Sequence, residues 1–152
     1  MSSPIGFQVT RFSQYLHRVY NNLNDNYYLY YTKIEQLSNS NIKDASEYKS
    51  IKNYLNNVKF VIYFLSMLEI SNIIASASTS VQECDRLPWY GTNILLHLMN
   101  KLNLAKAELK NGKVPSDWKY FDQQIKDLNS GVYKKVPLLL EGQQCNTIQV
   151  ST

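Results

Sequence analysis

Residues 59–74, KFVIYFLSMLEISNII, form the most apolar stretch of this chain, yet they include a carboxylate at Glu69. Each residue of a helix advances by about 100°, so this stretch carries two apolar stripes on roughly opposite sides. The first stripe leads toward Glu69 and consists of Ile51, Leu55, Val58, Ile62 and Leu65. The second consists of Phe60, Tyr63, Met67, Ile70 and Ile74. A helix that is apolar on every side must be buried, either in protein or in lipid.

The membrane interpretation requires about 20 consecutive apolar residues. Lys59, Glu69 and Asn72 interrupt this window. A charged residue near the centre of a span costs roughly 2.5–3.5 kcal/mol on insertion scales. The sequence therefore disfavours a membrane span and favours a helix within a soluble domain.

Apolar residues at spacings of three and four predict two long helices in the first half of the chain. The first covers residues 12–37. The second begins at Asp44, where Glu47 completes a capping-box pattern, and nothing interrupts it before Pro88. Because that is about 60 Å of helix at 1.5 Å per residue, we expect it to bend or fray at residues 76–80, SASTS.

Two shorter helices are predicted to follow the turn at residues 86–93. The first begins after a cap at Thr92 or Asn93 and stops at Gly112 in a left-handed conformation. The second carries Trp118 on its apolar face and ends at Gly131. We therefore predict an all-α, four-helix bundle-like domain over residues 1–131. Residues 132–152 have no helical period and are expected to form an extended arm with a loose terminus.

Composition limits the function classes only loosely. The 152 residues suit one domain, and the net charge of +4 is mildly basic. Arginine is scarce, and the lysines of the second half alternate with acidic residues, so we disfavour nucleic acid as a partner. Cys84 and Cys145 are far apart, and no signal peptide is recognisable at the start, which favours an intracellular location, cytoplasmic or nuclear.

The sequence offers little that could support catalysis. The histidines are His17 and His97, and they do not combine with a cysteine cluster into a metal-ligand pattern. Cys84 has no histidine near it in the sequence to activate it as a nucleophile. His97 lies off the leucine stripe of its helix, so we expect it at the surface. We predict a protein that is not an enzyme and has no metal or cofactor.

One short element suggests a different function. In RFSQYLH, Arg11 and His17 are separated by five residues, which resembles the Arg-x(4–6)-His element of HEPN-type RNases, a family of helical bundles. The resemblance implies that the two side chains act together on an RNA phosphate. It covers seven residues, Phe12 stands where a polar residue often follows the arginine, and the element normally occurs late in the bundle.

The main prediction is a non-enzymatic protein–protein interaction module, a subunit or adaptor of an intracellular assembly, bound to other proteins or to copies of itself. Aromatic residues and methionine are enriched in interface cores, although they are also ordinary core residues. The candidate contact residues on the second stripe and the arm are Phe60, Tyr63, Phe64, Met67, Ile70, Ile74, Leu138, Leu139 and Leu140. For Glu69 we expect solvent exposure where the first stripe ends. The alternative is a buried carboxylate paired with a cation, a polar contact that would fix register or partner choice.

Overall fold

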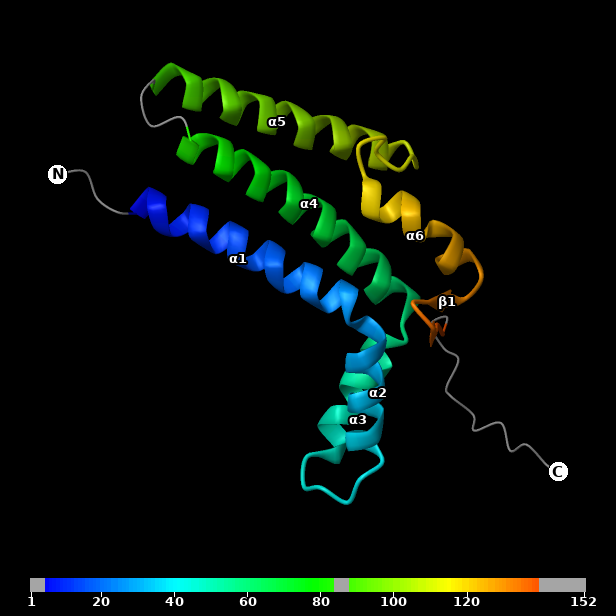
Figure 1. Cartoon of the computed structure of the whole chain (residues 1–152). Helices are drawn as coiled ribbons and strands as arrows, with labels where there is room; N and C mark the ends of the chain where they lie inside the picture. Colours follow the sequence, from blue (N-terminus) through cyan, green and yellow to red (C-terminus); the bar gives the residue numbers. More distant parts are fainter. Residues whose placement is uncertain (1–4, 84–87, 140–152) are drawn as a thin grey trace. The chain divides into compact units, whose positions relative to one another are not determined.

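The computed structural model describes the backbone of residues 5–83 and 88–139 and the side chains of residues 11–82, 89–124 and 127–139. Within these ranges the protein is all-α with a single small β-hairpin, which confirms the predicted all-α class, while the four-helix bundle arrangement stays a prediction (Figure 1). The helices are α1 (Ile5–Asp25), α2 (Tyr27–Ser38), α3 (Ala45–Leu55), α4 (Val58–Glu83), α5 (Pro88–Lys110) and α6 (Lys119–Asn129). The strands are β1 (Val132–Tyr133) and β2 (Val136–Pro137).

The chain forms two compact units, and each is described by itself. Unit 1 consists of residues 1–25 and 65–123, and unit 2 consists of residues 26–64 and 124–152. The first turns of α4 and the last turns of α6 therefore belong to unit 2.

The prediction of one continuous helix over residues 12–37 is wrong. The helix is interrupted at Asn26, whose backbone leaves the helical region at φ −107° and ψ 21°. The next residue, Tyr27, is fully buried, and its hydroxyl donates a 2.8 Å hydrogen bond to the carbonyl of Leu55 at the end of α3. The interruption thus starts a new helix whose first side chain is anchored in unit 2.

The second long helix is also divided, between Leu55 and Val58. The side chain of Asn57 accepts hydrogen bonds from the amides of Lys59 at 2.8 Å and Phe60 at 3.3 Å, so it caps a new helix. Extended backbone at Leu139 occupies the gap, because its amide donates to the carbonyl of Asn56 at 2.7 Å. Beyond the break, α4 continues as helix through residues 76–80 to Glu83, so the helix does not fray there.

The ends of the remaining helices follow capping and turn preferences, and the predicted start of α5 is corrected. α3 begins directly after Asp44 as predicted, although that side chain makes no capping hydrogen bond. α5 begins at Pro88 rather than after Thr92 or Asn93, because proline suits the first helical position, where a backbone amide has no partner. Gly112 has a φ of +70° after the end of α5, as predicted.

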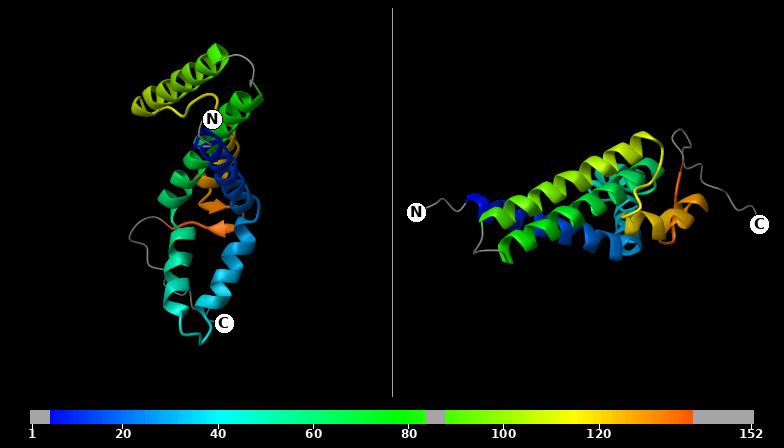
Figure 2. Two further views of the ribbon diagram at one scale, coloured as in Figure 1. Left: turned by 90° about the vertical axis from the view of Figure 1, so that its left-hand side faces the viewer. Right: turned by 90° about the horizontal axis from the view of Figure 1, so that it is seen from above.

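In unit 1, α4 lies between α1 and α5 (Figures 1 and 2). Polar contacts join α1 to α4: Ser13 and Ser78 are hydrogen-bonded at 3.0 Å, and Gln14 donates to Thr79 at 3.0 Å. The buried residues of this unit are Asn24, Leu65, Leu68, Glu69, Ser71, Ala75, Ala105, Trp118 and Phe121. The core of unit 1 is therefore centred on one side of α4.

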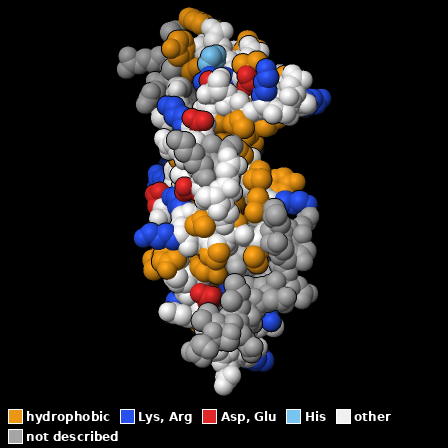
Figure 3. Space-filling view, turned by 90° about the vertical axis from the view of Figure 1, so that its right-hand side faces the viewer, with side chains coloured by type: hydrophobic (Ala, Val, Ile, Leu, Met, Phe, Trp, Pro, Cys, Tyr) orange, Lys and Arg blue, Asp and Glu red, His pale blue; other side chains and the backbone are white. Residues whose placement is uncertain are grey.

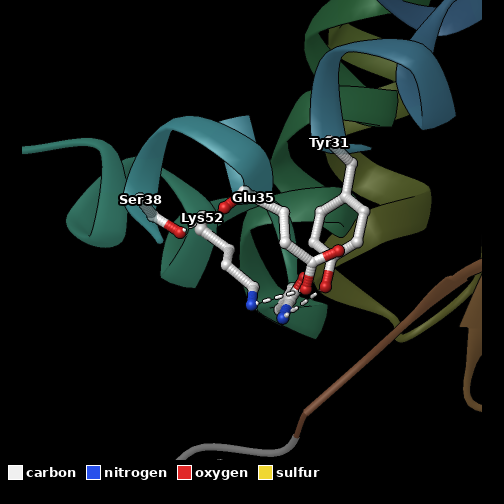
Figure 4. Close-up of polar contacts among 5 residues, drawn as sticks. Tyr31, Glu35, Ser38 and Lys52 are labelled. Atoms are coloured by element: carbon white, nitrogen blue, oxygen red, sulfur yellow. Dashed lines mark hydrogen bonds and ion pairs between the residues drawn. The ribbon is translucent and has the colours of Figure 1, made fainter. Parts of the chain in front are cut away.

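Unit 2 is built around the antiparallel pair of α2 and α3. Lys52 of α3 forms a 2.7 Å ion pair with Glu35 of α2, and its ammonium lies 5.9 Å from the centre of the Tyr31 ring (Figure 4). The buried residues of this unit are Tyr27, Tyr31, Leu55, Asn56, Val61, Phe64, Tyr133 and Val136. Side chains from both helices, from the start of α4 and from the β-hairpin therefore share one core.

The arm predicted for residues 132–152 begins as part of unit 2. Strands β1 and β2 pair in antiparallel register through a turn at Lys134 and Lys135, which both have positive φ. Tyr133 and Val136 are fully buried. Leu139 then pairs with Asn57 as an isolated parallel bridge. Residues 140–152, which include Leu140 and Cys145, lie outside the described residues.

Candidate functional site

Three aromatic side chains of unit 2 gather at its surface, and we call Tyr54, Phe60 and Tyr63 the aromatic patch. Tyr54 is 64% exposed and Tyr63 is 71% exposed, while Phe60 is half-buried. The ring centres of Tyr54 and Phe60 are 6.4 Å apart, and Phe60 and Tyr63 are neighbours on α4 because they are three residues apart. The patch therefore joins the end of α3 to the first turns of α4.

A chain of aromatic rings connects the patch to the core. Phe60 stacks on Phe64 with ring centres 6.3 Å apart, and Phe64 lies 6.0 Å from Tyr27. Tyr27 in turn meets Tyr133 of the β-hairpin edge-on at 4.8 Å. Burial raises the pKa of Tyr27, so its hydroxyl remains a protonated donor to the carbonyl of Leu55. The patch thus rests on packed rings that restrict its movement.

The break between α3 and α4 is what positions the patch. With Asn57 capping α4, Tyr54 precedes the break and Phe60 follows it. Leu139 holds the break from the other side through its bonds to Asn56 and to the amide of Val58. The sequence prediction omitted Tyr54, although an asparagine directly before an apolar run is a helix-start signal that would have placed it there.

The other predicted contact residues have different surroundings. Phe64 is 4% exposed and belongs to the core of unit 2, whereas Met67 is 42% exposed. Ile70 and Ile74 are half-buried in unit 1, and Leu138 and Leu139 are half-buried in unit 2. Whether any of these residues contacts a partner stays a prediction. Leu140 lies outside the described residues.

Glu69 is buried, with 2% exposure, so the expectation that it would be exposed is wrong. Its Oε1 accepts a 3.0 Å hydrogen bond from the amide of Phe121, in the first turn of α6. Burial raises the pKa of this carboxyl group, opposed by hydrogen bonds from the amides of Phe121 and Tyr120 and by the charge of Lys119. Glu69 therefore acts as a tertiary cap that fixes where α6 begins against α4.

His17 is held by polar contacts inside unit 1. Asn21 Nδ2 lies 2.9 Å from its Nε2, and Ser71 Oγ lies 3.1 Å from its Nδ1. An amide nitrogen can only donate, so Nε2 accepts and the proton is on Nδ1. Burial lowers the pKa of His17, which keeps this neutral form. Arg11 lies on the same helix and is exposed. The Nδ1 contact with Ser71 therefore links α1 to α4, and the Nε2 contact with Asn21 stays within α1 and fixes the ring.

The described part of the chain has no metal-ligand cluster and one long apolar helix. Among residues 11–82, 89–124 and 127–139, no three His, Cys, Asp or Glu side chains gather so that they could hold a metal ion. One helix, Val58–Gln82, is long and apolar enough to cross a membrane, with a mean hydropathy of 1.7. Core helices of soluble proteins have the same length and composition, and 39% of the apolar stretch of this helix is buried.

The described residues form an all-α protein whose exposed aromatic patch lies on a packed core. No protein-family model, curated protein or solved structure matches this chain.

Proposed function

We propose that this chain is a non-enzymatic protein–protein interaction module, a subunit or adaptor of an intracellular assembly, and that it binds its protein partner through the aromatic patch. The observation that carries the proposal is the exposure of Tyr54 and Tyr63 above a packed aromatic support. Tyrosine is enriched both in interface cores and among the residues that contribute most to binding.

The exposed area of Tyr54 and Tyr63 is large enough to contribute to the free energy of partner binding. A buried aromatic side chain removes about 150–250 Å² from water. Because Tyr54 and Tyr63 are 64% and 71% exposed, a partner that covered both would bury roughly 130 Å² of each. At about 25 cal/mol per Å² this contributes about 3 kcal/mol per residue before the costs of association. Rings that are already packed lose less freedom on binding, which lowers those costs.

The hydrophobic side chains of this protein reach its surface at several places, with charged side chains around them (Figure 3). Single exposed apolar residues are normal in soluble proteins. The aromatic patch differs from them because Tyr54 contacts Phe60, Phe60 stacks on the buried Phe64, and Tyr63 is three residues from Phe60 on the same helix. This is why we assign partner binding to the patch rather than to Met67, which is the most exposed of the predicted contact residues in unit 1.

A pair of matched double variants tests the proposal. Y54S/Y63S removes the two exposed rings of the patch, and Y15S/Y90S removes two tyrosines that are 63% and 51% exposed in unit 1. We expect both variants to keep the parent's helical circular dichroism. We expect the tagged parent and Y15S/Y90S to recover the same proteins from native cells, and Y54S/Y63S to lose them.

Two results would contradict the proposal. If Y54S/Y63S recovers the same proteins as Y15S/Y90S, the patch is not the contact surface. If the parent is monomeric by light scattering and recovers no protein at all, the chain is not an interaction module.

A further inference from the structure

Unit 1 contains an apolar pocket that is separate from the aromatic patch. Its volume is about 370 Å³, within the range of roughly 300–1,000 Å³ that is usual for small-molecule sites. Helix α4, helix α5 and the residue before α6 supply its apolar walls. These wall residues are Ile70, Leu102, Ala105, Leu109 and Trp118.

Two ammonium groups line the same pocket. Lys106 and Lys110 are one helical turn apart on α5, so their side chains lie on the same side of the helix. Both are exposed, and neither has an ion-pair partner among the described side chains, whereas Lys101 is 4.0 Å from Asp117. None of the described residues that line the pocket is acidic. Apolar walls with two cations suit a ligand that has an apolar body and an anionic end.

Three acceptor oxygens of the helices that line the pocket already have backbone donors. The carboxylate of Glu69, the neighbour of Ile70 in the sequence, accepts from the amide of Phe121. At the end of α5, the carbonyl of Glu108 accepts from the amide of Lys113 at 2.9 Å, and that of Leu109 accepts from Gly112 at 3.0 Å. Because Lys106 and Lys110 are exposed and have no ion-pair partner among the described side chains, their ammonium groups are available to an external anion.

From this combination we infer that the pocket binds an aliphatic carboxylate, with its chain against the apolar walls and its carboxylate at Lys106 and Lys110. The two ammonium groups favour the ligand's carboxylate, and the apolar walls favour its aliphatic chain. The inference is independent of the proposed function, because the pocket belongs to unit 1 and the aromatic patch to unit 2.

Trp118 supplies a direct reporter of binding. It lines the pocket at 2% exposure, and its indole Nε1 has no hydrogen-bond partner among the described residues. The other tryptophan, Trp89, is 64% exposed, so W89F leaves Trp118 as the sole tryptophan with little expected effect on folding. Titrating W89F with hexanoate, octanoate and decanoate, each kept below its micelle concentration, should give saturable changes in fluorescence.

Chain length and charge separate this site from general hydrophobic binding. Each added CH₂ should tighten binding about two- to fourfold, since burying it contributes about 0.8 kcal/mol when complete. In the W89F background, K106M/K110M should weaken decanoate binding about three- to tenfold while leaving decanol binding unchanged. K33M/K43M removes two exposed lysines of unit 2 and is the control with the same net charge.

The inference is overturned if decanoate causes no saturable change in Trp118 emission. It is also overturned if K106M/K110M binds decanoate as tightly as K33M/K43M does, or if affinity does not depend on chain length. Binding to phosphatidylcholine–phosphatidylserine vesicles without binding of free decanoate would mean that the surface recognises a lipid bilayer instead.

Discussion

The tertiary cap at Glu69 allows a quantitative test of how unit 1 is held together. Replacing Glu69 with alanine removes the acceptor for the amide of Phe121 and leaves a space at a position that is 2% exposed. An unpaired buried donor costs about 1–3 kcal/mol, and loss of a helix cap typically costs about 1 kcal/mol. Because these two terms overlap, we expect E69A to lower the free energy of unfolding by about 2 kcal/mol.

Glu69→Gln separates the hydrogen bond from the charge. Glutamine retains an acceptor oxygen of nearly the same shape, so E69Q should lose less than about 1 kcal/mol. The pKa of Glu69 is raised in the folded protein, so between the unfolded and folded pKa values the folded state holds more protons. The contribution of Glu69 is therefore complete below its unfolded pKa and is lost as pH rises through the folded pKa. Relative to E69Q, the parent should be more stable near pH 4 than near pH 8.

Urea unfolding followed by circular dichroism at the two pH values measures both effects. Asp122→Asn is the matched control, because Asp122 is an exposed carboxylate in the first turn of the same helix, and its loss should cost at most about 0.5 kcal/mol. The reasoning is refuted if E69A is as stable as the parent. It is also refuted if the stability of the parent relative to E69Q rises with pH.

Three further predictions concern the two units. Asn57→Ala should destabilise the protein by about 1 kcal/mol in thermal unfolding, because the amide of Lys59 loses its cap; no change would contradict that role. Tyr27→Phe should cost about 1–2 kcal/mol by leaving the carbonyl of Leu55 unpaired, and unchanged stability would argue against that bond. The pKa of His17, measured by NMR, should lie below its usual value. Its contribution to the free energy of unfolding then declines as pH falls, because the unfolded chain gains a proton before the folded protein does. An ordinary or raised pKa would refute this.

Local patterns were sufficient to predict the all-α class and several helix ends. Periodic apolar residues marked the helices, and Gly112 has the left-handed conformation expected of a helix stop. His97 is exposed, as its position off the leucine stripe predicted. These features depend on neighbours along the chain, which the sequence displays directly.

The remaining features depend on partners that are distant in the sequence. Glu69 is buried because an amide 52 residues further along the chain binds it, and an apolar stripe that ends in a carboxylate does not reveal that amide. The break at Asn57 had a local signal in its capping side chain, but Leu139, which occupies the gap as an isolated bridge, did not. The β-hairpin lacked a signal as well, since Lys134 and Lys135 adopt positive φ without the usual asparagine and glycine.

In the cell, we expect a protein partner to cover the aromatic patch. Hydrogen exchange of the chain, measured alone and in the complex recovered from native cells, tests this most directly. We predict slower exchange in the complex for peptides covering residues 51–64 and unchanged exchange for residues 11–20. Equal exchange of residues 51–64 in both states, together with protection elsewhere, would mean that the partner binds a different surface.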